Sequence, residues 1–203
     1  MKLLDGGRAP NPRRVRIFMA EKGIEIPLEQ VDITKAEHKT EEFTALNPVQ
    51  RIPVLILDDG TAIGEVSAIC RYFEETRPEP PLLGVDALDK ATVDMWNSRL
   101  QMHLLIPVAQ VFRHAHPAMA EMEKPQIAEW SEANRPRVME ALRWLNDRLS
   151  KSAFVAGDRF SIADITAMVA IDFLKPARLA VPEDHTALLA WYDKVRARPS
   201  YKA

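Results

Sequence analysis

The stretch from Asn47 to Phe73 has the residue types and spacing to bind a small acidic peptide. It predicts a proline-led apolar strand, an Asp58-Asp59-Gly60 hairpin, a short return strand and a helix that starts at Glu65. Asp-Gly between two apolar runs is a strong hairpin signal, because the glycine supplies the positive φ that the turn requires. The free N–H groups and the dipole at a helix start favour a carboxylate. The helix start at Glu65-Val66-Ser67 is therefore a candidate anion-binding site.

Pro53 stands where an extended peptide would meet this strand. Proline has no N–H for a ladder hydrogen bond, so Pro53 must begin its strand or lie on an edge. Only X-Pro bonds reach the cis state at a cost of roughly 0.5–1 kcal/mol, and we predict a cis Ile52–Pro53 bond. That bond would turn the amide and carbonyl of Ile52 away from the sheet and toward a peptide ligand.

The pattern Asn-Pro-x-x-x-Ile-Pro-Val-Leu, then Asp-Gly, then Glu-x-x-Ala-Ile-x-x-Tyr-Phe resembles the glutathione-binding half of cytosolic glutathione S-transferases. Phe154–Ile165 resembles a segment that helps the helical domain of this family to fold. The resemblance spans nearly the full chain and is loose only between Asp86 and Arg148. It implies an enzyme that takes glutathione as co-substrate, uses no metal, stabilises the thiolate and conjugates it to small hydrophobic electrophiles.

In this family the thiol is activated at the start of the first helix. A free thiol has a pKa near 8.5, which a helix N-terminus or a nearby donor lowers. Ala9 occupies the position of the usual serine, so that hydroxyl is absent, while Asn11 matches the asparagine of the bacterial Nu-class pattern Thr-Pro-Asn-Gly. An amide donates to a thiolate but cannot accept its proton. The resemblance thus implies a catalytic, charge-stabilising Asn11, although Asn11 before Pro12 also fits a helix cap.

The resemblance also implies contacts with both ends of glutathione. His38 and Lys39 stand where theta-like members bind the glycyl carboxylate, and Lys39 would serve by charge; a solvated charged loop is the alternative. Glu65 and Ser67 resemble the pair that holds the γ-glutamyl end, although Val66 stands where Ser or Thr is usual. The implied glutathione-binding set is Ala9, Asn11, His38, Lys39, Arg51, Ile52, Pro53, Glu65, Val66 and Ser67.

The electrophile site is expected on the first long helix of the second half, which in this family forms one wall of the cleft. Its candidates are His103, Pro107 and Phe112. A lone histidine on such a helix also fits a structural role. His114-x-His116 has no third ligand at a spacing usual for zinc, so we expect no metal site.

The order of elements predicts an α/β thioredoxin-like domain followed by an all-α helical domain. Residues 2–5 and 24–33 predict strands on either side of a helix that begins at Asn11 and ends before Gly23. With the hairpin and its helix this makes βαβ-α-ββα, with a mixed four-stranded sheet. The predicted domains are residues 1–77, a proline-rich linker at 78–88, and a helical domain at 89–203.

The second domain shows helical periodicity over most of its length. Pro107 predicts a kink, and Pro136 marks a kink or a boundary. Ser161 predicts a further helix start, with Asp164 in the reciprocal position of a capping box. The other predicted helices cover residues 87–116, 123–150 and 184–198.

The composition is that of a globular protein, with 47% hydrophobic and 28% charged residues and a formal net charge of −2. This balance favours neither nucleic acid nor a membrane surface as a partner. No apolar run approaches the roughly 20 residues of a spanning helix, and Met1–Gly6 is too short and polar for a secretory signal. The single cysteine, Cys70, excludes an intrachain disulfide and favours a cytoplasmic location; we expect it to pack as a small apolar group.

Other functions of the same site stay open. Glutathione-dependent isomerisation or disulfide reduction would use the same thiolate, but the Ser-Ser-Cys of the isomerases and the cysteine of the omega-like reductases are absent around Ala9 and Asn11. Ala9 and Val66 keep a non-catalytic glutathione-binding module open. The resemblance and the apolar residues of Val93–Phe112 predict a two-fold homodimer, in which the first domain of one chain pairs with the helical domain of the other.

Overall fold

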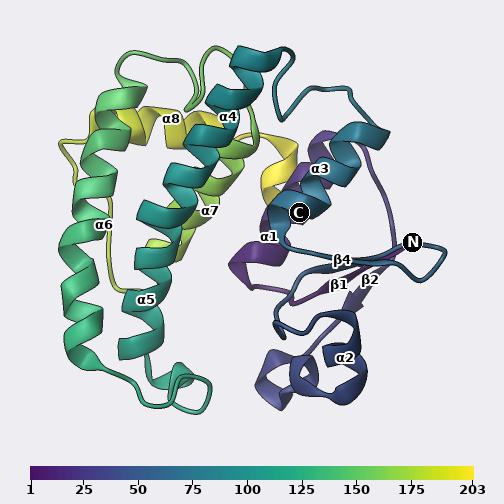
Figure 1. The fold of residues 1–203 in the computed structure, drawn as a ribbon. Coiled ribbons are helices and arrows are strands. Elements are labelled where there is room, and N and C mark those ends of the chain that lie inside the picture. The colour runs from purple at the N-terminus through teal and green to yellow at the C-terminus, as the bar shows by residue number, and fades with distance from the viewer. The chain divides into compact units, whose positions relative to one another are not determined.

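The computed structural model describes all 203 residues and divides them into two compact units (Figure 1). One unit comprises Met1–Pro81 with Lys202–Ala203, and the other comprises Leu82–Tyr201. The first contains all the strands and the second is entirely helical. The predicted fold class, a thioredoxin-like α/β domain followed by an all-α domain, is confirmed.

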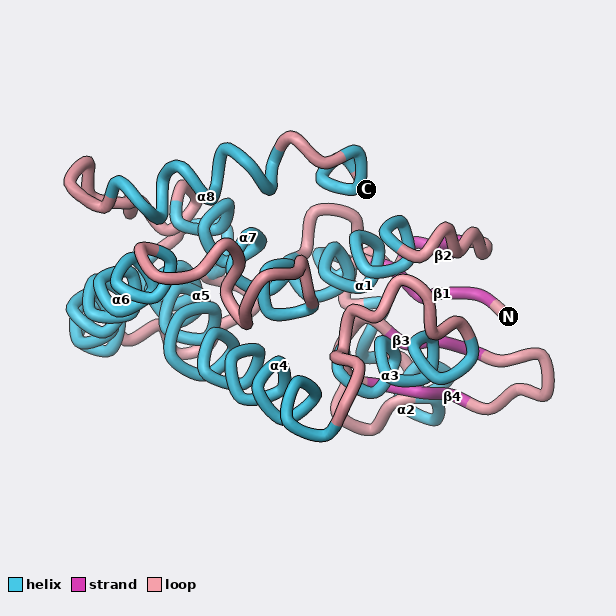
Figure 2. Tube along the Cα trace, turned by 90° about the horizontal axis from the view of Figure 1, so that it is seen from above, coloured by secondary structure: helices cyan, strands magenta, loops and turns pink.

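The four strands form one mixed sheet in the order β2-β1-β3-β4. β1 pairs parallel with β2 and antiparallel with β3, which in turn pairs antiparallel with β4, and Figure 2 shows the four strands. The predicted hairpin joins β3 to β4, and Gly60 has the expected positive φ of 86°. The strands are β1 Lys2–Asp5, β2 Leu28–Gln30, β3 Val54–Ile56 and β4 Ala62–Gly64.

The second strand is much shorter than the predicted 24–33. Pro27 directly precedes it, and the Asp32 side chain accepts the N–H groups of Thr34 and Lys35. Those bonds cap a short 3₁₀ turn at Ile33–Lys35. Aspartate competes with the strand ladder in this way, because its side chain offers the backbone a local alternative.

Three helices complete the first unit: α1 Pro10–Glu21, α2 Glu41–Leu46 and α3 Val66–Thr76. Val15, Phe18 and Met19 form the predicted buried face of α1. Gly23 follows this helix with a φ of 62°, as expected of a residue just beyond a helix end. A 3₁₀ turn, Glu37–Lys39, precedes α2, and Thr40 caps α2 by accepting the Phe43 N–H.

Lys22 joins the ends of α1 and α3. Its side chain is fully buried, and Nζ lies 2.7 Å from a carboxylate oxygen of Glu74. The same ammonium donates to the carbonyl oxygens of Arg77 and Pro80 at 2.7 Å each. It therefore satisfies backbone carbonyls that the end of α3 and the following segment leave without helical partners.

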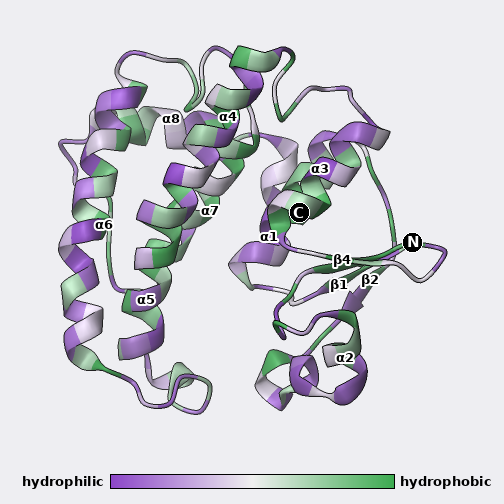
Figure 3. Cartoon of the chain, in the orientation of Figure 1, coloured by the Kyte–Doolittle hydropathy of each residue, from purple (hydrophilic) through white to green (hydrophobic).

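The second unit is built around α7, which is mostly apolar (Figure 3) and in which 11 of 13 residues are buried. Ser161 and Asp164 form the predicted capping box at its start. Asp164 also accepts the Val155 N–H at 2.9 Å and the Trp191 indole N–H at 3.0 Å. The helices of this unit are α4 Ala87–Leu100, α5 Ile106–Ala115, α6 Ala128–Leu149, α7 Ile162–Leu174 and α8 Thr186–Arg196.

The helix ends differ from the predictions where side chains or prolines decide them. α4 begins at Ala87, as predicted, because Asp86 accepts the Asp89 N–H; this start lies inside the predicted linker at 78–88. A π-helical turn, Gln101–Leu105, separates α4 from α5, and it lies one turn before Pro107. Pro136 lies within a continuous α6. No helix combines the length and apolar character needed to cross a membrane.

Candidate glutathione site

The loop after β1 lies against the residue before Pro53. A Cβ placed on Gly6 would stand 1.9 Å from Cδ1 of Ile52, and 3.5 Å from the Ala9 side chain. Only glycine permits this approach without displacement of Ile52. The fold thus brings the start of α1 next to the segment that carries Ile52 and Pro53.

Asp5, the last residue of β1, fixes this loop through its side chain. Its carboxylate is buried and accepts the Gly7 N–H at 3.0 Å, the Gln30 amide at 2.8 Å and the Arg16 guanidinium. Arg16 also donates to the Gly7 carbonyl oxygen at 2.8 Å. Both the N–H and the carbonyl group of Gly7 are thus bonded, and these bonds fix the loop from which α1 begins.

Asn11 lies in the first turn of α1 and does not cap it. The cap residue is Ala9, which makes no side-chain cap hydrogen bond, and the helix begins at Pro10. The predicted capping role of Asn11 is therefore wrong: either proline fits a first turn, and the helix starts at the earlier one. The exposed Asn11 side chain instead accepts a hydrogen bond through Oδ1 from Nη1 of Arg14, at 3.1 Å.

Arg14 is the buried cation behind Asn11. It is 1% exposed, and burial lowers its pKa to about 10, against the opposing effect of the Cys70 and Glu65 charges. The guanidinium is therefore still charged at neutral pH. Because it holds the carboxamide oxygen of Asn11, the N–H₂ group of Asn11 remains as the donor side of that amide.

The start of α3 has an unusual backbone. The helix begins at Val66, one residue later than predicted, and its cap residue Glu65 has a φ of 63° and makes no side-chain cap bond. Val66 is buried, whereas the Glu65 and Ser67 side chains are exposed. Val66 thus contributes to the core and offers its backbone, while its two neighbours offer polar side chains.

The Ile52–Pro53 bond is cis, as predicted. Pro53 directly precedes β3, which lies inside the sheet between β1 and β4, so of the two predicted placements Pro53 takes the strand start and not an edge. Ile52 is half-buried, Arg51 is exposed, and the Arg51 guanidinium donates to the Gln50 carbonyl oxygen at 3.1 Å.

His38 and Lys39 lie apart from these elements, in the 3₁₀ turn that precedes α2. His38 is half-buried and Lys39 is exposed. Their placement is compatible with a carboxylate contact as well as with a solvated loop.

The candidate electrophile residues differ in their exposure. His103 is exposed in the π-helical turn, whereas Pro107 is buried. Phe112 is half-buried and packs against the tilted rings of His116, at 4.7 Å, and Phe173, at 5.1 Å, measured between ring centroids. Of the three, Pro107 contributes mainly to packing.

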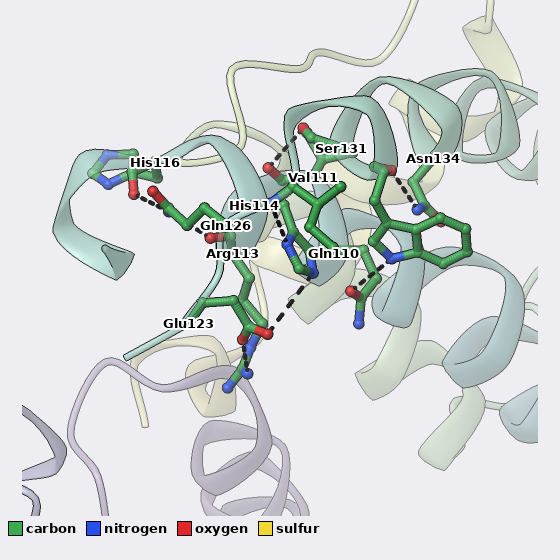
Figure 4. Close-up of polar contacts among 11 residues, drawn as sticks. Gln110, Val111, Arg113, His114, His116, Glu123, Gln126, Ser131 and Asn134 are labelled. Atoms are coloured by element: carbon green, nitrogen blue, oxygen red, sulfur yellow. Dashed lines mark hydrogen bonds and ion pairs between the residues drawn. The ribbon is translucent and has the colours of Figure 1, made fainter. Parts of the chain in front are cut away.

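The histidines beyond Phe112 hold a loop in place (Figure 4). His114 Nδ1 accepts the Ile127 N–H at 3.1 Å, and Gln126 donates to the carbonyl oxygens of Arg113 and His116. Arg113 also pairs with Glu123 at 2.7 Å. These contacts tie the segment before α6 to the end of α5. No group of three His, Cys, Asp or Glu side chains is arranged to hold a metal ion.

Sequence reasoning missed the residues that support the site. Asp5, Arg14 and Asn47 are all buried polar residues beside candidate site residues. The i, i+3 spacing of Asn11 and Arg14 was the available signal, because residues so spaced are neighbours on a helix. That spacing predicts the contact between Arg14 and Asn11, but not the burial of Arg14, which depends on how α1 packs.

The first unit has a thioredoxin-like sheet, with two helix starts beside a cis-proline segment, and the second unit is all-helical. This combination is that of the glutathione transferase type of two-domain protein. The comparisons agree. Residues 9–76 match the family model "Glutathione S-transferase, N-terminal domain", and residues 102–199 match "Glutathione S-transferase, C-terminal domain". The chain belongs to the glutathione S-transferase family, whose members use glutathione as substrate.

Individual relatives match over the whole chain. Glutathione S-transferase 2 of Saccharomyces cerevisiae is 38% identical over 100% of this chain and 88% of its own length. The crystal structure of Gtt2 from the same yeast superposes with a TM-score of 0.95 at 38% identity, covering 100% of this chain and 99% of that one. A glutathione S-transferase domain-containing protein of Marinobacter aquaeolei VT8 also gives 0.95, at 37% identity, covering 98% and 99%.

The relatives come from yeast, plants and bacteria. The match is therefore with the superfamily at large. The likeness to the bacterial Nu class and to theta-like members rests on Asn11 and His38 alone.

Proposed function

We propose that this protein conjugates glutathione to small hydrophobic electrophiles in the cytoplasm. The observation that carries the proposal is the exposed Asn11 carboxamide, whose oxygen is held by the buried Arg14. Its N–H₂ group is the donor for the glutathione sulfur. A donor oriented in advance stabilises developing charge without the cost of reorganisation.

Glutathione binds along three segments of the first unit. The γ-glutamyl carboxylate accepts N–H groups at the start of α3, where the helix dipole favours an anion. Glu65 pairs with the γ-glutamyl ammonium, and the backbone of Ile52 pairs with the cysteinyl unit. Cationic side chains hold the glycyl carboxylate; the candidates are His38, Lys39 and Arg51.

The thiol proton leaves to solvent, because neither Asn11 nor Ala9 can accept it. The remaining thiolate is stabilised by the Asn11 amide, which Arg14 holds in place, and by the start of α1. The sulfur then attacks the electrophilic carbon, the C–S bond forms, and a leaving group such as halide departs with the bonding electrons. His103 and Phe112 are the proposed contacts for the electrophile, with Pro107 behind them.

A homodimer is part of the proposal. Leu88, Met95, Met102 and Ile106 are exposed apolar side chains at helical spacing along α4, the π turn and α5. Such a stripe on an exposed face is costly unless another surface covers it. We propose that a second copy of this chain covers it, with the first domain of one chain against the helical domain of the other.

The competing function is a non-catalytic glutathione-binding module, which is favoured by Ala9, the cap residue of α1 without a hydroxyl. Two measurements on the wild-type protein decide between them. An ultraviolet titration of bound glutathione should give a thiol pKa at least one unit below the free value, and an aryl halide should be turned over at pH 7. Binding of glutathione with an unshifted thiol pKa and no turnover would favour the module.

A further inference from the structure

Asn47 lies between two of the segments that the proposed function assigns to glutathione. It is the residue that ends α2, and its backbone N–H donates to the Phe43 carbonyl oxygen at 2.9 Å. Asn47 is 7% exposed. A buried carboxamide is expected to use its hydrogen-bonding groups within the protein, so its contacts indicate what it organises.

The first contact fixes the loop that leads to Ile52 and Pro53. Nδ2 of Asn47 donates to the Arg51 carbonyl oxygen at 2.8 Å, and Oδ1 accepts the Val49 N–H at 3.2 Å. Between them Gln50 has a φ of 54°, which is uncommon for a residue other than glycine. A single side chain thus bridges the loop on both sides of its strained residue.

The second contact is with the strand that leads to Glu65. A Cβ placed on Gly64 would lie 3.5 Å from Nδ2 and 3.7 Å from Cγ of Asn47. The Asn47 carboxamide therefore packs against the backbone of the residue directly before Glu65. Gly64 in turn pairs with Val54 in the β3–β4 ladder, one residue beyond Pro53.

We infer that Asn47 is a positioning residue for glutathione, which sets the spacing between the Arg51–Pro53 segment and the start of α3. The inference rests on the proposed function and deepens it. Asn47 acts on the peptide backbone and the γ-glutamyl end, through Arg51 and Gly64, and has no contact with Asn11. Its loss should therefore weaken binding of the peptide and leave activation of the thiol unchanged.

The test uses Asn47→Asp and Asn47→Ala. Aspartate keeps the acceptor for Val49 but loses the donor to the Arg51 carbonyl, whereas alanine loses both. Titration calorimetry with S-methylglutathione, which has no thiol to ionise, should show Kd raised at least about tenfold in each variant, equivalent to ~1.4 kcal/mol. The KM for glutathione should rise by the same factor, while kcat and the thiol pKa of bound glutathione stay within about twofold and a few tenths of a unit.

Thr44→Val is the matched control. It removes the hydrogen bond of 3.0 Å from the Gln50 side chain in the same loop but leaves the Arg51 carbonyl contact intact. Its Kd should stay within about twofold of the wild-type value.

A folded Asn47→Asp with the wild-type Kd, or with a thiol pKa that moves with Kd, would overturn the inference. So would a failure of Asn47→Asp to fold, since the role would then be general stability. If instead the wild-type protein fails to bind S-methylglutathione, the proposed function itself falls.

Discussion

The guanidinium of Arg14 donates to the carboxamide oxygen of Asn11 across 3.1 Å, one turn apart at the start of α1. One partner is buried and charged, and the other is exposed and neutral. The pair thus leaves the Asn11 amide N–H₂ group as a donor two residues after Ala9, which stands where the family's usual serine is expected.

Asn11→Ala should raise the pKa of bound glutathione by about one unit and lower turnover at pH 7 about tenfold, since one unit corresponds to roughly 1.4 kcal/mol. Thiolate absorbance across pH measures the first effect and aryl halide turnover the second. Affinity for S-methylglutathione should change little. Because Asn11 does not cap α1, any fall in the melting temperature should come only from the lost hydrogen bond with Arg14. A thiol pKa equal to that of the wild type would exclude Asn11 as the activating group.

Arg14→Met tests whether the arginine acts through Asn11. Without its anchor the Asn11 amide rotates freely, so the thiol pKa should rise, though by less than in Asn11→Ala. The double variant should have the thiol pKa of Asn11→Ala, because interacting residues are not additive. Full additivity of the two shifts would show that the Arg14 charge acts directly on the sulfur.

Asp164 should make the stability of the second unit depend on pH. Burial raises the pKa of its carboxyl from 3.8 to about 6, against the donors from Val155, Trp191 and Ser161. Between pH 3.8 and about 6 the folded protein holds a proton on Asp164 that the unfolded chain has lost. The contribution of Asp164 to the free energy of unfolding therefore falls as pH rises, by up to about 3 kcal/mol.

Asp164→Asn removes this titration. Urea unfolding of both proteins at pH 4, 5, 6 and 7 should show the wild-type advantage shrinking as pH rises. At every pH the variant should be less stable, since its N–H₂ group would face N–H donors and leave at least one unsatisfied, at a cost of about 1–3 kcal/mol. A pH-independent difference between the two proteins would contradict the prediction.

Lys22→Met should destabilise the first unit by about 3–5 kcal/mol, because it leaves the Glu74 carboxylate buried without its ammonium partner. Chemical denaturation followed by circular dichroism measures this loss. The added change Glu74→Gln should recover part of it. Lys2→Met is the control: its pair with Glu29 is 2.6 Å long but half-exposed, so the expected loss is below about 1 kcal/mol. An equal loss of stability in Lys22→Met and Lys2→Met would contradict the stabilising role of the buried Lys22–Glu74 pair.

Met95→Glu should convert the homodimer to monomer by placing a charge in the exposed apolar stripe. Light scattering at micromolar concentration measures the mass. Met139→Glu, on α6, is a matched control because Met139 and Met95 are 37% and 39% exposed. A single-chain mass for the wild-type protein would show that no dimer forms, and a dimeric Met95→Glu would place the interface elsewhere.

Local chemistry made part of the fold predictable. Asp59-Gly60 specifies a hairpin and Ser161 with Asp164 a capping box through neighbours a few residues apart, and both are present as predicted. The start of α1 was misassigned because Pro10 and Pro12 both fit a first turn around Asn11. The length of β2 depended on Asp32, whose side chain competes with the ladder.

The supporting residues of the site were beyond this reasoning. Arg14 is buried only because α1 packs on its neighbours, and Asn47 is informative only because Arg51 and Gly64 both reach it. Neither arrangement has a signature in a single segment.

Glu65 carries a left-handed φ of 63° without being glycine. Such a conformation costs on the order of 1–3 kcal/mol and persists only where the surroundings enforce it. The resting protein therefore stores energy at the residue that we propose to contact the γ-glutamyl group. Glycine at this position would relax that backbone and make the unliganded fold more robust, at the expense of a rigid receptor for the peptide. At Glu65 the stability of the unliganded fold and the rigidity of the binding site thus make opposite demands on the backbone.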